Sequence, residues 1–414
     1  MKPAIQTNIK SFLRYIKHAL EPLGYQFARV LFFLIPRFTP KINDQNFGMN
    51  FIGFARGELG LGQAMRSMAY AVRAATIPFA IRKFNVRLVS RQSNSDLDFF
   101  SSDSCRYPIN IICVNPDMLN RLPLWIKYSE WAKTYNIGYW FWELENFPSS
   151  WKYATHIVDE IWAATEFIAQ AMRKSGKKVV KIPFPLEFQL PPESMNKSYF
   201  GINPAKFTFL FSFDFLSAIE RKNPQGVIMA FRQAFPSWND SVQLILKTMN
   251  SSSNPVALRR LEEMIDGDPR IELREDYLSQ DEIRGLIRSA DCYISLHRAE
   301  GLGLGLAEAM YMGKPTIATG YSGNLEFMNE DNSILVPHKL IPIALGAYPN
   351  GFGGHWADPD IGVAAQKMKE LVVDKQQQIE IGKKAALFMR QMHSYVKVSE
   401  FINHQLKNIL HTGY

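Results

Sequence analysis

The chain has few cysteines and no long apolar run. Its 414 residues include three cysteines, Cys105, Cys113 and Cys292, and no Cys-x-x-Cys pair. A disulfide framework or a cysteine-based zinc site is therefore not expected, and a reducing compartment fits. The densest apolar run, Val30 to Ile35, is far shorter than the ~18 residues that a membrane span needs. Basic and polar residues interrupt the first twenty positions, and no small-residue cleavage site follows, so no signal peptide is expected.

The overall composition is typical of a folded globular protein. Apolar residues make up 47% of the chain and charged residues 21%, which excludes a mainly disordered protein. A length of 414 residues accommodates two domains of ordinary size. The eight histidines do not pair with carboxylates at metal-ligand spacing, so no bound metal is expected.

Positive charge is concentrated at the N-terminal end. The net charge is +8, and residues 1–48 hold seven Lys or Arg against only Glu21 and Asp44. A generally basic protein would indicate nucleic acid, whereas a basic, aromatic-rich segment beside a nearly neutral body indicates an anionic membrane surface and no nucleic acid. Within residues 8–35, apolar side chains recur at roughly helical spacing. This pattern fits an interfacial membrane helix, and it fits equally an amphipathic helix packed on the protein's own surface.

From residue 49 the sequence alternates short apolar strands with amphipathic helices, which is the pattern of parallel βαβ units. The strands expected in the first half are Asn50–Phe54, Ile77–Ile81, Ile109–Val114, Asn136–Trp142, Glu160–Ala164 and Val179–Pro183. The strands expected in the second half are Phe207–Phe213, Val242–Lys247, Ile271–Leu273, Cys292–Leu296 and Pro315–Ala318. The helices expected there are Pro224–Phe235, Pro255–Met264 and Ser279–Ser289, the last with Ser279 as its N-cap.

Four prolines between Pro183 and Pro192 mark a hinge between two halves of similar size. The expected fold class is therefore α/β, with two Rossmann-like, doubly wound domains. In such sheets, ligands bind at the carboxyl ends of the strands.

The most informative segment joins the strand ending at Leu296 to the next helix. Its loop carries Glu300 and three alternate glycines, and Glu308 lies about one turn into the helix. Unpaired N–H groups at a helix start, beside the positive end of the helix dipole, suit a phosphate group. Two carboxylates would repel that phosphate, so they are better explained as acceptors for hydroxyl groups. Without the surrounding loop, a pair of glutamates would instead be interpreted as ordinary solvated side chains on a helix. A nucleotide sugar offers hydroxyl groups on both sides of its diphosphate.

The wider pattern around these glutamates resembles the signature of retaining glycosyltransferase family 4, glycosyltransferase group 1. Glu300 and Glu308 stand within Glu-Gly-x-Gly-Leu-x-x-x-Glu-Ala-Met, and Gly-Lys-Pro-Thr-Ile-Ala follows at 313–318. The resemblance covers most of residues 49–390 and is strongest over 207–330. It implies the GT-B fold, in which two Rossmann-like domains face each other across a cleft.

The resemblance also implies a division of the chain. An acceptor domain would span residues 49–190 and a nucleotide-sugar domain residues 191–389. Residues 390–414 would form a last helix that returns to the N-terminal domain, and residues 1–48 would remain as the basic extension.

Donor-binding roles follow from the same resemblance. Glu300 would contact hydroxyls of the donor sugar, and Glu308 would bind the ribose hydroxyls. The main chain of the loop between them would meet the donor phosphates; its residues are Gly301, Leu302, Gly303 and Leu304. The turn after the next strand would also face the diphosphate; it consists of Ser322, Gly323 and Asn324. His297 is either a phosphate or sugar contact or a structural histidine.

The leaving diphosphate needs positive charge, because it gains negative charge as the glycosidic bond breaks. In the family an Arg and a Lys supply this charge, usually several residues apart. Here Arg221 and Lys222 are adjacent, at the start of the second domain. Lys222 is the favoured catalytic cation and Arg221 the second; a charge pair at a helix start is the alternative.

A glycine-bearing turn follows the first strand and contains Gly57, Gly60 and Gly62. It resembles the first βα loop of GT-B N-terminal domains, which implies that Gly60 and Gly62 lie near the donor phosphate. Arg66 would then reach an acceptor phosphate. A dinucleotide-binding loop is the rival, but the spacing is not Gly-x-Gly-x-x-Gly, and no acidic residue is evident ~20 positions on.

The segment around Trp142 is the candidate for the acceptor side. Alternation along a strand places Trp140 and Trp142 on one face, and aromatic faces suit sugar rings. Glu143, at the end of the strand, would contact the acceptor hydroxyl. Core packing is the alternative, and it is preferred for Tyr139 and Phe141.

The expected function is that of a retaining hexosyltransferase in surface polysaccharide biosynthesis. It would move a sugar from a nucleoside-diphosphate sugar to a hydroxyl of a glycan or a lipid-linked acceptor, with no cofactor. The expected location is the cytoplasm, with peripheral docking on the inner face of the cell membrane if residues 1–48 bind lipid. The alternatives are a sugar-nucleotide epimerase or phosphorylase with the same fold, and a non-catalytic sugar-nucleotide-binding subunit.

Overall fold

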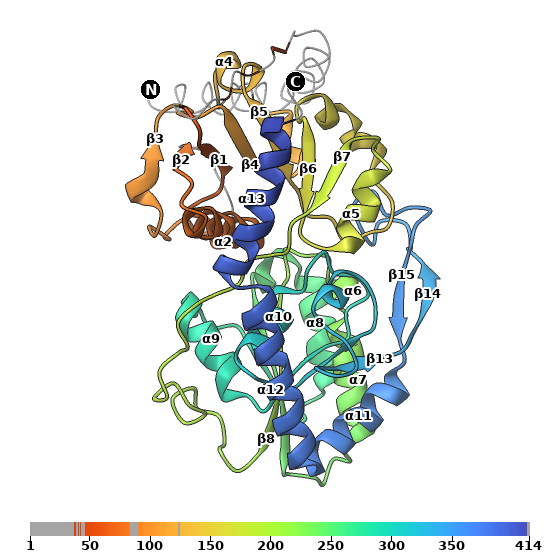
Figure 1. The fold of residues 1–414 in the computed structure, drawn as a ribbon. Coiled ribbons are helices and arrows are strands. Elements are labelled where there is room, and N and C mark those ends of the chain that lie inside the picture. The colour runs from red at the N-terminus through yellow and green to blue at the C-terminus, as the bar shows by residue number, and fades with distance from the viewer. Residues whose placement is uncertain are drawn as a thin grey trace, which may run out of the picture.

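Two parallel sheets, one above the other, form the framework of the computed structural model (Figure 1). The structure describes residues 37–38, 40, 42, 46–82, 90–122 and 125–411. The helix predicted within residues 8–35 lies outside the described residues. None of the described helices is long and apolar enough to cross a membrane.

The N-terminal sheet has the strand order β3-β2-β1-β4-β5-β6-β7, and every pair is parallel. Its strands are β1 (Met49–Gly53), β2 (Phe79–Arg82), β3 (Ser101–Ser102), β4 (Ile109–Cys113), β5 (Tyr135–Tyr139), β6 (Glu160–Ala163) and β7 (Lys178–Lys181). Its helices are α2 (Gly60–Ala74), α3 (Pro116–Leu119), α4 (Tyr128–Ala132) and α5 (Glu166–Arg173). The central strands β1, β4 and β5 are buried along their whole length, as expected for parallel strands covered on both faces.

The C-terminal sheet has the order β10-β9-β8-β11-β12-β13, also parallel throughout. Its strands are β8 (Phe207–Asp214), β9 (Val242–Met249), β10 (Ile271–Arg274), β11 (Cys292–Ser295), β12 (Thr316–Thr319) and β13 (Ile334–Val336). Its helices are α6 (Ile219–Lys222), α7 (Pro224–Ala234), α8 (Pro255–Ile265), α9 (Gln280–Ser289), α10 (Leu304–Tyr311), α11 (Ile361–Val373) and α12 (Lys375–Met392). An antiparallel hairpin, β14 (His338–Pro342) and β15 (His355–Pro359), extends from this domain.

The predicted fold class of two doubly wound α/β domains is confirmed, and the predicted strands and helices match the observed ones to within a few residues. The N-cap of α9 is also confirmed. The Ser279 side chain accepts a hydrogen bond from the Glu282 amide, and the Glu282 carboxylate accepts one from the Ser279 amide. This reciprocal pair satisfies two donors that a helix start leaves open.

One predicted strand is too long. β5 ends at Tyr139, so the chain has left the sheet before Trp140 and Trp142, and strand alternation does not place these two rings on one face. The indole of Trp140 packs directly over Gly138, where a larger residue would clash with it. Both tryptophans are buried.

The last helix, α13 (Tyr395–His411), packs against α2 of the N-terminal domain (Figure 1). The chain thus crosses between the domains twice, and the two crossing segments lie side by side. The Leu186 amide donates to the His393 carbonyl at 2.7 Å, and His393 Nδ1 donates to the Phe184 carbonyl at 2.8 Å.

Candidate active site

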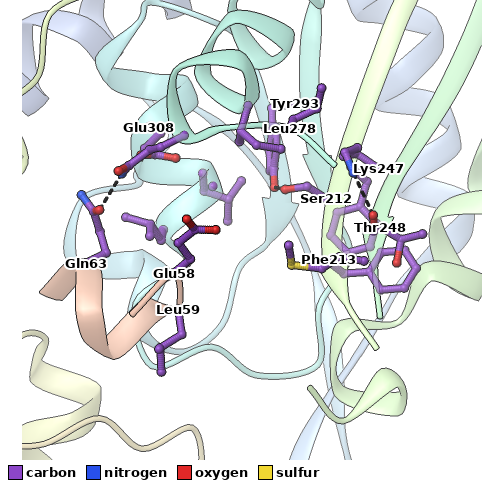
Figure 2. Close-up of a pocket in the computed structure, with 18 of the residues that line it drawn as sticks. Glu58, Leu59, Gln63, Ser212, Phe213, Lys247, Thr248, Leu278, Tyr293 and Glu308 are labelled. Atoms are coloured by element: carbon purple, nitrogen blue, oxygen red, sulfur yellow. Dashed lines mark hydrogen bonds between the residues drawn. The ribbon is translucent and has the colours of Figure 1, made fainter. Parts of the chain in front are cut away.

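A cavity of about 500 Å³ lies between the two domains, at the carboxyl ends of the C-terminal strands. On the N-terminal side it is lined by Glu58, Leu59 and Gln63, at the start of α2 (Figure 2). On the opposite side it is lined by the ends of β8 and β9 and by the first turns of α9 and α10. This is the edge at which doubly wound sheets bind their ligands.

Glu300 and the two adjacent cations form a cluster at the cavity, in which Glu300 and Arg221 are buried and Lys222 is partly exposed. Lys222 Nζ lies 2.6 Å from Glu300 Oε1, and Arg221 NH1 lies 3.1 Å from Glu300 Oε2. Burial alone would raise the pKa of Glu300, but the charges of Lys222 and Arg221 lower it to about 2. Glu300 is therefore a carboxylate at any physiological pH, and it holds both cations at the site.

The two cations occupy different positions in this cluster. Lys222 lines the cavity, and its side chain is 20% exposed. Arg221 lies behind it, with a side chain that is 5% exposed and donates to the Ala299 carbonyl at 2.7 Å. The Arg221 carbonyl in turn accepts from the Arg298 amide. Lys222 is thus the cation that faces the cavity, while Arg221 braces the loop that carries Glu300.

Glu308 lines the cavity from α10 and forms an ion pair within its own domain. Its Oε1 lies 3.1 Å from Nε of Arg284, a residue of α9. The guanidinium of Arg284 lies over the Phe188 ring at 4.0 Å. Burial raises the pKa of Glu308, and Arg284 opposes that shift. The Phe188 ring thus holds the Arg284 guanidinium from one side, and the in-plane Nε contact fixes the Glu308 carboxylate at the cavity wall.

The start of α10 forms the part of the cavity suited to phosphate. Gly303 caps the helix with a φ of +88°, a conformation that glycine adopts without strain. The first N–H groups of a helix have no partner within it, and they lie at its positive dipole end. Gly305 lies so close to the Tyr293 hydroxyl that a side chain would clash with it. These glycines bring the main chain to the cavity surface.

Other predicted donor-site residues lie behind this loop rather than in the cavity lining. His297 is fully buried and bonds through Nε2 to Asn324 Oδ1, at 3.1 Å. Ser322 Oγ accepts from the Glu300 amide at 2.8 Å. Gly323 donates its N–H to the Glu300 carbonyl at 2.8 Å. These residues fix the path of the Glu300 loop.

Two further loop residues contact the N-terminal domain or the core. The carbonyl of Gly301 accepts from Thr165 Oγ1 at 3.0 Å, across the domain boundary. Leu302 is 8% exposed and belongs to the hydrophobic core.

The predicted residues of the first βα loop hold that loop together. Arg66 NH1 donates to the carbonyls of Ala55 and Gly57, both at 2.9 Å, and its side chain also borders the cavity. Gly62 packs against the Gly57 carbonyl, and Gly60 faces open space. Neither glycine belongs to the cavity lining.

The predicted acceptor residues meet the C-terminal domain. Glu143 accepts a hydrogen bond from the Tyr348 hydroxyl and lies 3.9 Å from Arg221 NH2. Its side chain is 26% exposed. Trp142 is 4% exposed and packs between Trp151 and Tyr348, with ring centroids 4.8 and 5.6 Å away. Trp142 therefore belongs to the packing between the domains.

Sequence reasoning missed several residues of the cavity. Glu58 and Gln63 lie within the loop already singled out, and they hydrogen-bond across the cleft to Tyr277 at 3.2 Å and Gln280 at 2.5 Å. Lys247 ends a predicted strand, so the rule that ligands bind at carboxyl ends would have found it. Arg284 had no such signal in the sequence.

Comparisons with known proteins agree with this architecture. Residues 213–346 match the family model of glycosyl transferases group 1, about a third of the chain. No curated protein matches the sequence. HepE from Anabaena, solved in complex with UDP and glucose, superposes with a TM-score of 0.63 at 14% identity, over 87% of this chain and 100% of HepE.

Two further solved structures share this architecture. Sucrose-phosphate synthase from Thermosynechococcus elongatus has a TM-score of 0.63 at 13% identity, over 88% of this chain and 99% of its own. A glycosyltransferase from Rickettsia africae has a TM-score of 0.61 at 14% identity, over 91% of this chain and 100% of its own. The chain has the GT-B fold. The segment that matches the family model contains Lys222, Glu300 and Glu308. The family match and the shared fold together support the identification of the chain as a glycosyltransferase.

Proposed function

We propose that the chain is a retaining glycosyltransferase of family 4 that uses a nucleoside-diphosphate sugar. The observation that carries the proposal is the pairing of Lys222 with Glu300 at a cavity that also contains the open start of α10. A cation, an anion-binding helix start and two carboxylates match the charges and hydroxyls of such a donor.

Each group has a distinct role in the proposed reaction. The start of α10 holds the diphosphate, and Glu308 accepts hydrogen bonds from the ribose hydroxyls. Lys222 neutralises the charge that develops on the leaving diphosphate. The incoming phosphate takes over part of the contact between Lys222 and Glu300. Glu300 can then accept hydrogen bonds from the transferred sugar.

The acceptor is proposed to enter from the N-terminal domain. Glu143, a partly exposed carboxylate 3.9 Å from Arg221, contacts the attacking hydroxyl. The hydroxyl attacks on the face from which the diphosphate leaves, and the leaving phosphate takes the proton, so the anomeric configuration is retained. The acceptor is a hydroxyl of a glycan or a lipid-linked glycan, in surface polysaccharide synthesis at the inner face of the membrane.

Similar structures support the donor class. HepE was solved with UDP and glucose and with UDP-glucose, and the pneumococcal O-GlcNAc transferase GtfA with UDP and GlcNAc. These proteins are 14% identical to this chain, so they support the class of donor and leave the choice of base and sugar to experiment.

The proposal is tested by incubating the protein with a panel of UDP-, GDP- and ADP-sugars and following hydrolysis by NMR. We expect the sugar to be released with its original anomeric configuration. We expect this hydrolysis to be lost in Lys222→Ala. Inversion would refute retention. An epimerised nucleotide sugar would indicate an epimerase, and turnover only with inorganic phosphate a phosphorylase. Binding without turnover would indicate a non-catalytic subunit.

A further inference from the structure

A second lysine, Lys247, lines the cavity at the carboxyl end of β9 and has no part in the proposed transfer step. Its side chain is 4% exposed. Nζ donates to the carbonyls of Thr248 at 2.8 Å and Asp276 at 2.5 Å. The Asp276 carboxylate forms an ion pair with Nζ at 3.7 Å, a distance longer than that of a hydrogen bond. An ammonium has three N–H bonds, so one remains without a hydrogen-bond partner among the described residues.

Lys247 stands apart from the phosphate-binding part of the cavity. In the sheet, β8 lies between β9 and β11, the strand that leads to the Glu300 loop. Two strand spacings amount to ~10 Å. Figure 2 shows Lys247 and Thr248 on one side of the hydrogen-bonded pair Ser212 and Tyr293, and Glu308 on the other. A diphosphate at the start of α10, with its ribose at Glu308, would direct its base toward Lys247.

The wall around Lys247 suits a flat ring with a polar edge. Phe213, Met249 and Leu278 supply apolar surface. Thr248 Oγ1 is buried and has no hydrogen-bond partner among the described residues. Apolar faces with a few fixed polar groups at one edge are the usual form of a site for an aromatic ligand.

We propose that Lys247 recognises the nucleobase of the donor and selects a base with an exocyclic oxygen, uracil or guanine, over adenine. The free N–H of Lys247 donates to the O2 or O4 of uracil or to the O6 of guanine. Adenine has no carbonyl oxygen. Its ring acceptors N1 and N7 both lie beside the exocyclic amino group, which is itself a donor and would oppose the N–H of Lys247. The inference rests on the proposed function and adds the class of base to it.

The test measures the dissociation constants of UDP, GDP and ADP by calorimetry. Because a hydrogen bond from a charged group is involved, the better of UDP and GDP should bind at least about tenfold more tightly than ADP. Lys247→Met should bring the ratio of dissociation constants close to one. It should weaken binding of the better of UDP and GDP and leave the affinity for ADP nearly unchanged. Lys314→Met is the control, because Lys314 is a partly buried lysine that lies outside the cavity lining; it should leave the ratio unchanged.

The outcomes separate this inference from the proposed function. If ADP binds as tightly as UDP and GDP, or if Lys247→Met keeps the ratio, the role of Lys247 is wrong while the transferase proposal stands. If none of the three diphosphates binds, the proposed function fails and this inference with it. If Lys247→Met does not fold, Lys247→Gln replaces it, and the ratio in the unmodified protein still decides.

Discussion

The hydroxyl of Tyr348 donates a 2.5 Å hydrogen bond to Oε2 of Glu143, and this bond joins the two domains beside the buried Arg221. Tyr348 lies in the loop between β14 and β15, and Glu143 follows β5. The Arg221 guanidinium lies 5.8 Å from the Tyr348 ring centroid. Burial, together with the neighbouring Glu143, raises the pKa of Tyr348, so its hydroxyl stays protonated and can donate. The bond therefore fixes Glu143 next to Arg221, which in turn holds Glu300.

Tyr348→Phe should lower the rate of donor turnover. A hydrogen bond to a charged group contributes about 1.5–3 kcal/mol. Without this bond, Glu143 is held less firmly beside Arg221. We expect turnover to fall about tenfold or more while the affinity for the bare nucleoside diphosphate stays within about twofold, since this bond lies outside the diphosphate contacts. Steady-state hydrolysis and calorimetry measure the two quantities.

The chain contains a matched control for this substitution. Tyr321 also bonds across the domains, to Glu145 at 2.9 Å, but Glu145 makes no described contact with Arg221 or Glu300. Tyr321→Phe should lower the melting temperature to a similar degree and leave turnover nearly intact. Equal turnover losses in the two variants would mean that Tyr348 acts only through domain stability.

Lys222→Ala should lower turnover ~100-fold or more, with a smaller effect on donor binding, because a cation at the leaving group acts mainly in the transition state. Glu300 keeps its partner Arg221 at 3.1 Å, so the loop should remain in place. Lys339→Ala, at an exposed position of β14, is the control for a lost positive charge. Turnover equal to that of the unmodified protein would remove Lys222 from the mechanism.

Glu308→Ala should weaken binding of the bare nucleoside diphosphate by about 1–3 kcal/mol, because a buried acceptor for two ribose hydroxyls is lost. Glu308→Gln keeps one acceptor oxygen and should lose less. Both variants disturb Arg284, so the melting temperature is recorded alongside calorimetry. An unchanged diphosphate affinity in the folded Glu308→Ala protein would show that the ribose contact is wrong.

His297 should make the protein less stable in mild acid. Its Nε2 bonds to the acceptor Asn324 Oδ1, and its Nδ1 lies 3.1 Å from Ser295 Oγ, so the neutral ring fits with its proton on Nε2. Burial lowers the pKa of His297 below the ordinary value of 6.5. Below about pH 6.5 the unfolded chain therefore binds more protons, and the unfolding free energy falls by up to ~1.4 kcal/mol per pH unit for this group.

Melting temperatures between about pH 7 and pH 5 measure this effect. His297→Gln should flatten the decline on the acid side, whereas His404→Gln, at an exposed position, should not. If the melting temperature changes with pH by the same amount in the unmodified protein and in both variants, the acid sensitivity does not come from His297.

Removing residues 1–36 should release the protein from anionic liposomes. This segment carries five Lys or Arg against one Glu, and each cation near such a surface contributes ~1 kcal/mol that fades with salt. The cut spares Arg37, which pairs with Asp159 at 2.6 Å in the N-terminal domain. Donor hydrolysis should stay nearly intact, because the cavity is lined by residues from Glu58 onward.

Co-sedimentation of the full-length protein decides between the two readings of this segment. If the protein does not bind anionic vesicles at low salt, the hypothesis that this segment docks on a membrane is wrong. A large fall in melting temperature after the deletion would indicate a helix packed on the body of the protein instead.

The sequence by itself determined the elements of both domains and the contiguous part of the site. Apolar runs of strand length and amphipathic helices are local signals, so the βαβ pattern could be followed along the chain. Glu300, the alternate glycines and Glu308 lie on one strand–loop–helix unit. Their proximity to the cavity follows from the rule that ligands bind at the carboxyl ends of parallel strands.

Only the tertiary structure decided which side chains meet. Tyr348 and Glu143 are 205 residues apart, and Arg284 and Glu308 come from different helices, so their contacts depend on how domains and helices pack. The same holds for burial: His297 and Asn324 lie behind the loop while Lys247 faces the cavity. A pattern along the chain encodes which face of an element is apolar, but a contact between distant residues arises from packing that many side chains determine together.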